Sequence, residues 1–151
     1  MEFLNGNCID SSVNGVKFTN KCLYSNNYFH IYENNVHEIK IIIMQNTSEF
    51  TPNILVDDKE IIQISPFENN KIIIDFSNKG DFNKVRSNGI KLICALINKF
   101  QIPIENILPL RYFSNEKILN PRQILKSEEN WKSNWCFFQF LIMREFEMIY
   151  N

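Results

Sequence analysis

Residues 86 to 121 decide the fold: RSNGIKLICALINKFQIPIENILPLRYFSNEKILNP. From Ile90 to Phe100, apolar residues recur at the three- and four-residue spacing of a helix that is largely buried. The dipeptide Ile102-Pro103 ends this helix, because a residue before proline disfavours the helical conformation. A short strand-like run follows, and then a loop with the polar side chains Arg111, Lys117 and Asn120. A strongly apolar helix that leads into a polar loop indicates that the loop lies at a site.

Three segments before this helix predict a β-sheet. Glu38 to Thr47 (EIKIIIMQNT) and Lys71 to Phe76 (KIIIDF) contain β-branched runs without polar alternation, which are typical of strands covered on both faces. Asn53 to Ile64 reads as two strands around a turn at residues 57–59. We therefore predict the α/β class, with a central mixed β-sheet of about five strands and helices packed on its faces.

The N-terminal 37 residues predict additional strands. Asn14-Gly15 is a tight-turn signal, and Cys8 to Val13 and Val16 to Leu23 flank it as the two arms of a hairpin. No linker or low-complexity block interrupts the chain. We predict a single domain over residues 1–151, with strands and a hairpin extension in 1–37 and the core of the domain in 38–151.

A second long helix is predicted at the C-terminus. Ser127 is a candidate N-cap, and the acidic residues Glu128 and Glu129 suit the first turn of a helix. The residues of one apolar face fall three or four apart: Trp131, Trp135, Phe138, Ile142, Phe146 and Ile149. An aromatic face of this kind is typical of a helix that packs on a sheet.

Composition and charge exclude several classes of function. The net charge of −1 predicts no strong attraction to nucleic acid or to an anionic membrane. The N-terminus has no basic segment followed by an apolar one, so it shows no secretory signal. The most apolar window, residues 135–143, is too short to span a bilayer. We expect a cytoplasmic protein with reduced thiols, although Cys8 and Cys22 could bridge two strands in an exported one.

No metal or nucleophile motif is visible. The cysteines and histidines are scattered, at Cys8, Cys22, Cys94 and Cys136 and at His30 and His37. None of them forms a CxxC pair or a cluster at zinc-finger spacing. The chain also lacks a GxSxG motif and a phosphate-binding loop.

The order of the elements resembles the N-acetylmuramoyl-L-alanine amidases, the family that includes the peptidoglycan recognition proteins and the amidase-type phage lysozymes. Residues 44–47 (MQNT) resemble the family's Ile-His-His-Thr at the end of a core strand, and residues 56–61 (VDDKEI) resemble its Val-Asp-Arg-Asp-Gly hairpin. Residues 100–107 (FQIPIENI) are similar to its Tyr-Gly-Ile-Pro phrase. Residues 109–112 (PLRY) and 117–121 fall where Gly-His-Arg-Asp and the last loop stand. The resemblance covers residues 38–140 and implies an amidase-like fold.

The resemblance also implies a zinc site, and the chain departs from the family there. The positions of the family's zinc ligands are Gln45, Leu110 and Asn120 in this sequence. Neutral amides and Leu are not serviceable ligands for tetrahedral zinc. Without the metal, nothing polarises the scissile amide or activates a water molecule. We therefore expect no cofactor and no enzymatic activity, that is, a pseudoenzyme.

The first hypothesis for its function is a binding module for a muropeptide or a peptide in the former active-site cleft. The floor of the cleft would be Gln45, Asn46 and Thr47, and its rim Arg111, Lys117 and Asn120. The two cations would meet a carboxylate of a stem peptide. The structural alternative for the same residues is that Gln45 and Asn46 satisfy one another and that Arg111 pairs with a neighbouring acid.

The second hypothesis is a protein-interaction module, such as an immunity protein, an inhibitor or a phage counter-defence protein. Its surface would be an exposed aromatic patch among Tyr24, Tyr28, Phe29 and Tyr32. A third hypothesis is an active peptidoglycan amidase with unfamiliar ligands.

Overall fold

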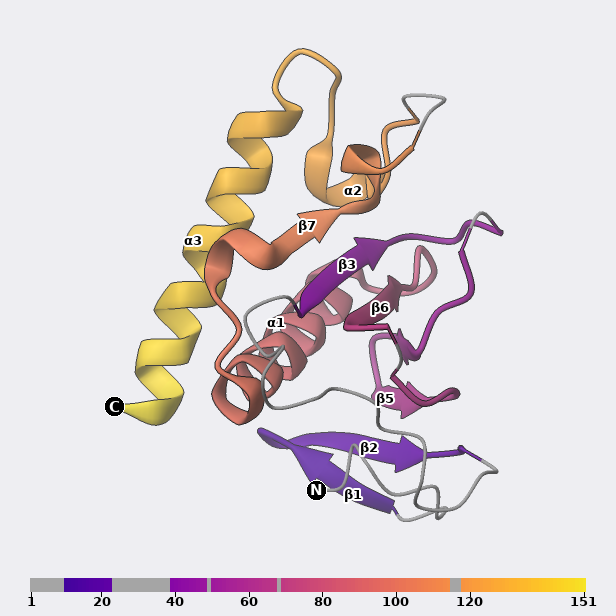
Figure 1. Cartoon of the computed structure of the whole chain (residues 1–151), viewed down its shortest axis with the longest axis vertical. Helices are drawn as coiled ribbons and strands as arrows, with labels where there is room; N and C mark the ends of the chain where they lie inside the picture. Colours follow the sequence, from indigo (N-terminus) through magenta and orange to yellow (C-terminus); the bar gives the residue numbers. More distant parts are fainter. Residues whose placement is uncertain (1–9, 23–38, 49, 68, 115–117) are drawn as a thin grey trace.

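The computed structural model of the chain describes residues 10–22, 39–48, 50–67, 69–114 and 118–151 (Figure 1). Within these residues, seven strands form one mixed sheet in the order β1-β2-β5-β4-β6-β3-β7. The strands are β1 (Asp10–Val13), β2 (Val16–Asn20), β3 (Lys40–Met44), β4 (Ile54–Val56), β5 (Glu60–Gln63), β6 (Lys71–Phe76) and β7 (Ile107–Pro109). The helices are α1 (Phe82–Phe100), α2 (Arg122–Leu125) and α3 (Trp131–Tyr150), with short 3₁₀ helices η2 (Ile104–Asn106) and η3 (Leu110–Tyr112). The predicted α/β class with a mixed sheet is confirmed.

The sheet has more strands than the predicted five because it is extended at both edges. β1 and β2 pair around the Asn14-Gly15 turn, which confirms the predicted hairpin, and β2 then pairs in parallel with β5. Asn14 and Gly15 have φ values of 48° and 87°, a conformation that these two residue types adopt readily. At the opposite edge, β7 pairs in parallel with β3. The division of the chain at residue 37 stays a prediction.

β3 is covered on both faces, as its apolar run predicted. It lies between β6 and β7 and runs parallel to both. Ile41 and Ile43 belong to the main core of the protein. Ile42 and Met44 face the other side, where they form a smaller cluster with Leu110 of η3. The position of β3 therefore determines where the polar residues from residue 45 onward lie, at the end of this strand.

β6 differs from the prediction, because only one of its faces is fully buried. Ile72, Ile74 and Phe76 belong to the main core, whereas Ile73 and Asp75 between them are half-buried. The main core lies between this face and α1, which Figure 1 shows behind the strands. The opposite face of β4, β5 and β6 stays partly open. A run of isoleucines does not reveal this, since burial of the second face depends on what the rest of the chain places over it.

Helix α1 ends before Ile102-Pro103, as the sequence predicts, and it begins at Phe82, before the apolar repeat that starts at Ile90. The Asp81 carboxylate accepts the N–H of Asn83 at 3.0 Å and caps the first turn, and Gln101 ends the helix in the left-handed conformation with φ 57°. Gly89 lies against the sheet, and a Cβ at this position would be 2.1 Å from the ring of Phe76. The missing side chain of Gly89 therefore allows α1 to approach β6 closely.

Helix α3 begins at Trp131, later than predicted. The hydroxyl of Ser127 accepts the N–H of Asn130 at 3.3 Å in a turn that precedes the helix. The predicted apolar face is confirmed, since its central residues are buried in the core: Trp135, Phe138 and Ile142. None of the helices in the described part of the chain has the length and apolarity to cross a membrane. The cytoplasmic location stays a prediction.

Candidate functional site

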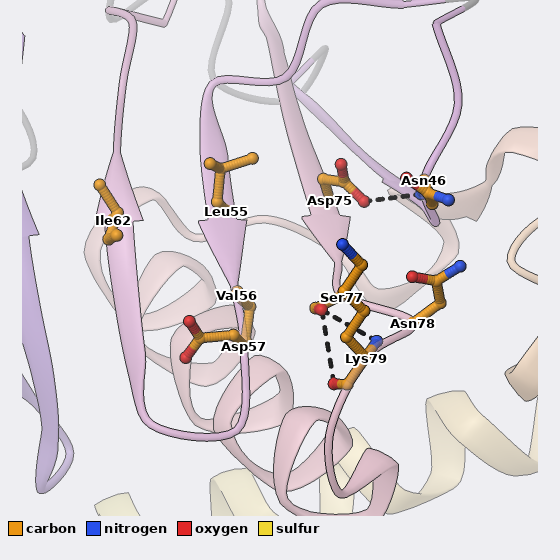
Figure 2. Close-up of a pocket in the computed structure, with 9 residues that line it drawn as sticks. All are labelled: Asn46, Leu55, Val56, Asp57, Ile62, Asp75, Ser77, Asn78 and Lys79. Carbon is orange, nitrogen blue, oxygen red and sulfur yellow. Dashed lines mark hydrogen bonds between the residues drawn. The ribbon is translucent and has the colours of Figure 1, made fainter.

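Two adjoining grooves lie at the carboxyl ends of the parallel strands β3 and β6. The amide groove has a volume of about 390 Å³, and its polar lining is Gln45, Asn46, Asn78, Asn120, Arg122 and Gln123. The sheet groove has a volume of about 260 Å³, and its lining includes Asn46, Leu55, Ile62, Asp75, Asn78 and Lys79 (Figure 2). Asn46 and Asn78 line both grooves. The carboxyl ends of parallel strands are where α/β folds place their ligands.

Gln45 and Asn120 hold the floor of the amide groove together. The backbone N–H of Gln45 donates to Oδ1 of Asn120 at 2.7 Å. In return, Nδ2 of Asn120 donates to the backbone carbonyl of Gln45 at 2.9 Å. The two residues are 6% and 8% exposed, so these hydrogen bonds are shielded from water. This reciprocal pair joins the end of β3 to the loop before α2.

The side chain of Gln45 is engaged as well. Its Nε2 donates to Oε1 of Gln123 at 2.6 Å, and its Oε1 accepts the backbone N–H of Gln123 at 3.0 Å. Both ends of the amide therefore have partners in α2. The lining side chains that remain exposed at the groove include Asn46, Asn78 and Arg122.

The residues of the amide groove do not fit zinc. Of the three positions that match the ligands of the resembled family, Gln45 and Asn120 are bonded to each other, and Leu110 is 1% exposed in the smaller core cluster. In the part of the chain that the structure describes, no three His, Cys, Asp or Glu residues are grouped to hold a metal ion. Amides and an aliphatic side chain supply none of the imidazole, thiolate or carboxylate donors that zinc prefers.

Arg111 is not among the residues that line the amide groove. Its Nη2 forms an ion pair with Oε2 of Glu128 at 3.1 Å, and its guanidinium lies 5.0 Å from the centroid of the Trp131 ring. Arg111 therefore pairs with an acidic residue, which is the structural alternative to ligand binding that the sequence offered for it. Arg122 is the cation that lines the groove, and within the described residues no ion pair engages it.

The remaining predicted residues are placed as follows. Thr47 is half-buried and does not line either groove. Lys117 lies outside the described residues, as do the histidines and the residues of the predicted aromatic patch: His30, His37, Tyr24, Tyr28, Phe29 and Tyr32. The protein-interaction hypothesis therefore stays a prediction.

Sequence reasoning missed Asn78, Arg122 and Gln123. Asn78 follows β6 just as Asn46 follows β3, so the rule that polar residues after parallel strands meet at one edge of the sheet could have found it. Arg122 and Gln123 belong to α2, which is only four residues long and carries no periodic signal. The sole local sign of this helix is the preceding Pro121, since proline favours helix starts.

Asp75 is a half-buried titratable group in the lining of the sheet groove. Burial raises the pKa of the Asp75 carboxyl, and the hydrogen bond from the backbone N–H of Asn46 to Oδ1, at 2.9 Å, opposes that shift. Asp57 also lines this groove, but its Oδ1 accepts the N–H groups of Lys59 and Glu60 at 2.8 Å each. Asp57 therefore holds the turn between β4 and β5, and Asp75 is the carboxylate that the groove presents.

Comparisons with known proteins show what the fold is similar to. No protein-family model matches the sequence, and no curated protein matches it. The PlyG catalytic domain, solved in solution, is 17% identical and aligns with a TM-score of 0.57 over 84% of this chain and 93% of that chain. PlyL is 20% identical, with a TM-score of 0.55 over 68% of this chain and 82% of that chain. The catalytic domain of XlyA is 21% identical, with a TM-score of 0.50 over 64% of this chain and 84% of that chain.

The fold is that of endolysin catalytic domains. The predicted amidase-like architecture is confirmed at this level. The prediction that the chain is not an enzyme is wrong as it was made, because the solved structures that share its fold include catalytic domains. The argument from Gln45, Leu110 and Asn120 concerned zinc alone, and it does not exclude chemistry by other groups.

Proposed function

We propose that the chain binds a muropeptide, a sugar-peptide fragment of peptidoglycan, in the amide groove. The observation that carries this proposal is a polar groove of about 390 Å³ at the carboxyl ends of β3 and β6, on a fold shared with endolysin catalytic domains. This volume falls within the roughly 300–1,000 Å³ that is usual for small-molecule sites.

The exposed groups of the groove suit a ligand that is part sugar and part peptide. The side-chain amides of Asn46 and Asn78 offer both donors and acceptors to hydroxyl and peptide groups. Arg122 offers a guanidinium that can bind a carboxylate with two parallel hydrogen bonds. Ile118, which is 43% exposed, adds an apolar surface at the same groove. These groups support recognition of a sugar-peptide that ends in a carboxylate.

The hydrogen bonds beneath the groove support the same proposal. Gln45 forms hydrogen bonds with Asn120 through its backbone and with Gln123 through its side chain. The floor of the groove is therefore preformed in the absence of a ligand. A site that needs no ordering on binding loses less conformational entropy.

Calorimetric titration with muramyl dipeptide tests the proposal. We expect saturable binding with one ligand per chain, and binding about tenfold weaker in Arg122→Ala, since a charge-assisted hydrogen bond contributes about 1.5 kcal/mol or more. Arg144→Ala is the matched control, because it removes the same charge from an exposed position on α3 outside both grooves. An absence of binding, or equal losses in the two variants, would refute the proposal.

Mass spectrometry of the same mixtures after incubation measures hydrolysis separately. Release of free dipeptide by the chain would extend the function from binding to cleavage of the amide between the sugar acid and the peptide. An Arg122→Ala variant that loses binding and release together would assign both to the amide groove.

A further inference from the structure

We infer that the outward face of α3 is the interface of a symmetric dimer, in which the α3 helices of two copies of this chain pack antiparallel around Phe140. This dimer is independent of muropeptide binding. Of the seven large apolar side chains that are exposed within the described residues, four lie on α3: Phe137, Phe140, Met143 and Met148. Figure 1 shows α3 at the outer edge of the described chain, where a second copy can reach it.

The exposed side chains extend the apolar character of α3 beyond the side that packs on the core. The core side is buried through Trp135, Phe138 and Ile142. On the outward side, the rings of Phe137 and Phe140 are 59% and 56% exposed and stack with their centroids 6.3 Å apart. A helix that is apolar on all sides is typical of one that is covered on all sides. A continuous aromatic surface of this kind is typical of a protein interface.

The charged residues of this face are placed symmetrically about Phe140. Lys132 lies eight residues before Phe140, and Glu147 lies seven residues after it. With a rise of about 1.5 Å and a turn of about 100° per residue, the two lie at similar distances from Phe140 along the helix and on the same flank. A two-fold axis between antiparallel helices keeps each flank on its own side of the pair. A second copy centred on Phe140 therefore brings Lys132 of each chain beside Glu147 of the other.

The other flank is complementary in the same register. Phe137 lies three residues before Phe140, and Arg144 lies four residues after it, both on the flank opposite to Lys132 and Glu147. The guanidinium of Arg144 in one chain therefore meets the ring of Phe137 in the other, which is a cation–π contact. The two Phe140 rings meet at the symmetry axis. One register thus supplies a partner for every one of these five side chains.

The mixture of charges on the face favours a second copy as its occupant. Within the described residues no ion pair engages Lys132, Arg144 or Glu147. The ammonium of Lys132 lies 5.7 Å from the centroid of the Trp131 ring, and Lys132 remains exposed. A uniformly acidic or basic partner would leave at least one of the three charges facing a like charge. A second copy pairs the opposite charges at both ends of the interface.

Sedimentation of the full chain over a concentration series tests the interface. We expect the wild type to approach twice the 18.0 kDa mass of one chain as its concentration rises. Phe140→Ala should raise the dissociation constant at least about tenfold, because an aromatic side chain at the centre of an interface is usually among those that contribute most to binding. Ile64→Ala is the matched control, since it truncates an exposed apolar side chain next to β5 and should leave the dissociation constant unchanged.

Charge reversal tests the register. Lys132→Glu places two acids together at each end of the dimer, and Glu147→Lys places two cations together. Each variant alone should self-associate about tenfold more weakly, because two attractions become two repulsions. An equimolar mixture of the two variants restores opposite charges at both ends and should associate as tightly as the wild type. Lys59→Glu makes the same charge change at an exposed position between β4 and β5, and it should behave as the wild type.

A wild type that stays monomeric at every concentration would overturn the dimer, as would a mixture of the charge variants that fails to restore association. A monomer that binds phosphatidylcholine vesicles, and loses this binding in Phe140→Ala, would assign the face to a lipid surface instead. Phe140 and Arg144 line neither groove, so their variants should leave muropeptide binding unchanged. Failure of the dimer and failure of the proposed function are therefore distinguishable.

Discussion

Replacement of Asn120 by Ala tests whether the reciprocal amide pair holds the floor of the groove together. The variant loses both hydrogen bonds to the backbone of Gln45 and leaves its N–H and its carbonyl without those partners, at a residue that is 6% exposed. An unsatisfied buried group costs about 1–3 kcal/mol. Because the adjoining groove can admit water to part of this site, we expect a loss of about 3 kcal/mol in the free energy of unfolding rather than the full sum for two groups.

Urea denaturation, followed by the fluorescence of Trp131 and Trp135, measures this loss. With a slope of about 2 kcal/mol per molar urea, the midpoint of unfolding should fall by about 1.5 M. Asn120→Asp keeps an acceptor for the N–H of Gln45 and loses the donor, so it should fall between wild type and Asn120→Ala.

Asn78→Ala is the matched control, because Asn78 is an exposed amide of the same groove. An exposed polar side chain should change stability by no more than about 0.5 kcal/mol. If Asn120→Ala were as mild as Asn78→Ala, water would be replacing the reciprocal pair, and the argument for a preformed floor would fail.

Three other predictions follow from the same geometry. Arg111→Ala should reduce the free energy of unfolding by about 1 kcal/mol in urea denaturation and leave ligand binding unchanged, since Arg111 pairs with Glu128 outside the groove. Weaker ligand binding at unchanged stability would show that Arg111 contacts the ligand. Gly89→Ala should destabilise the protein by about 2–3 kcal/mol, because its Cβ would meet the ring of Phe76 at 2.1 Å; an unchanged melting temperature would contradict the close packing of α1 on β6. Protein purified without a chelator should contain no stoichiometric zinc by emission spectrometry, and one zinc per chain would contradict the donor argument.

The sequence predicts the elements whose signal is local. The apolar run of β3, the helical spacing of α1 and the aromatic face of α3 each depend on side chains within one element, and the structure confirms all three. The open face of β6 was not predictable in this way. The half-burial of Asp75 depends on which part of the chain covers the strand. The pattern of apolar residues within 71–76 carries no information about that coverage.

The same distinction holds for the site. Gln45, Asn46 and Asn120 were found because they follow a core strand or match a motif position, and the structure places them in one groove. Arg111 stands at a motif position too, but its partner Glu128 lies 17 residues further along the chain. Arg122 carries no motif and lies in a helix of four residues. The choice between two arginines therefore depended on tertiary contacts.

The proposal that the amide groove is a ligand site is tested most directly by chemical-shift mapping. Spectra of ¹⁵N-labelled protein, recorded during titration with muramyl dipeptide, report which amides sense the ligand. The account predicts that the changes concentrate at Asn46, Asn78, Arg122 and Gln123, which line the groove. Saturable changes confined to the exposed side of α3, around Phe137 and Phe140, would contradict it, as would spectra that do not change.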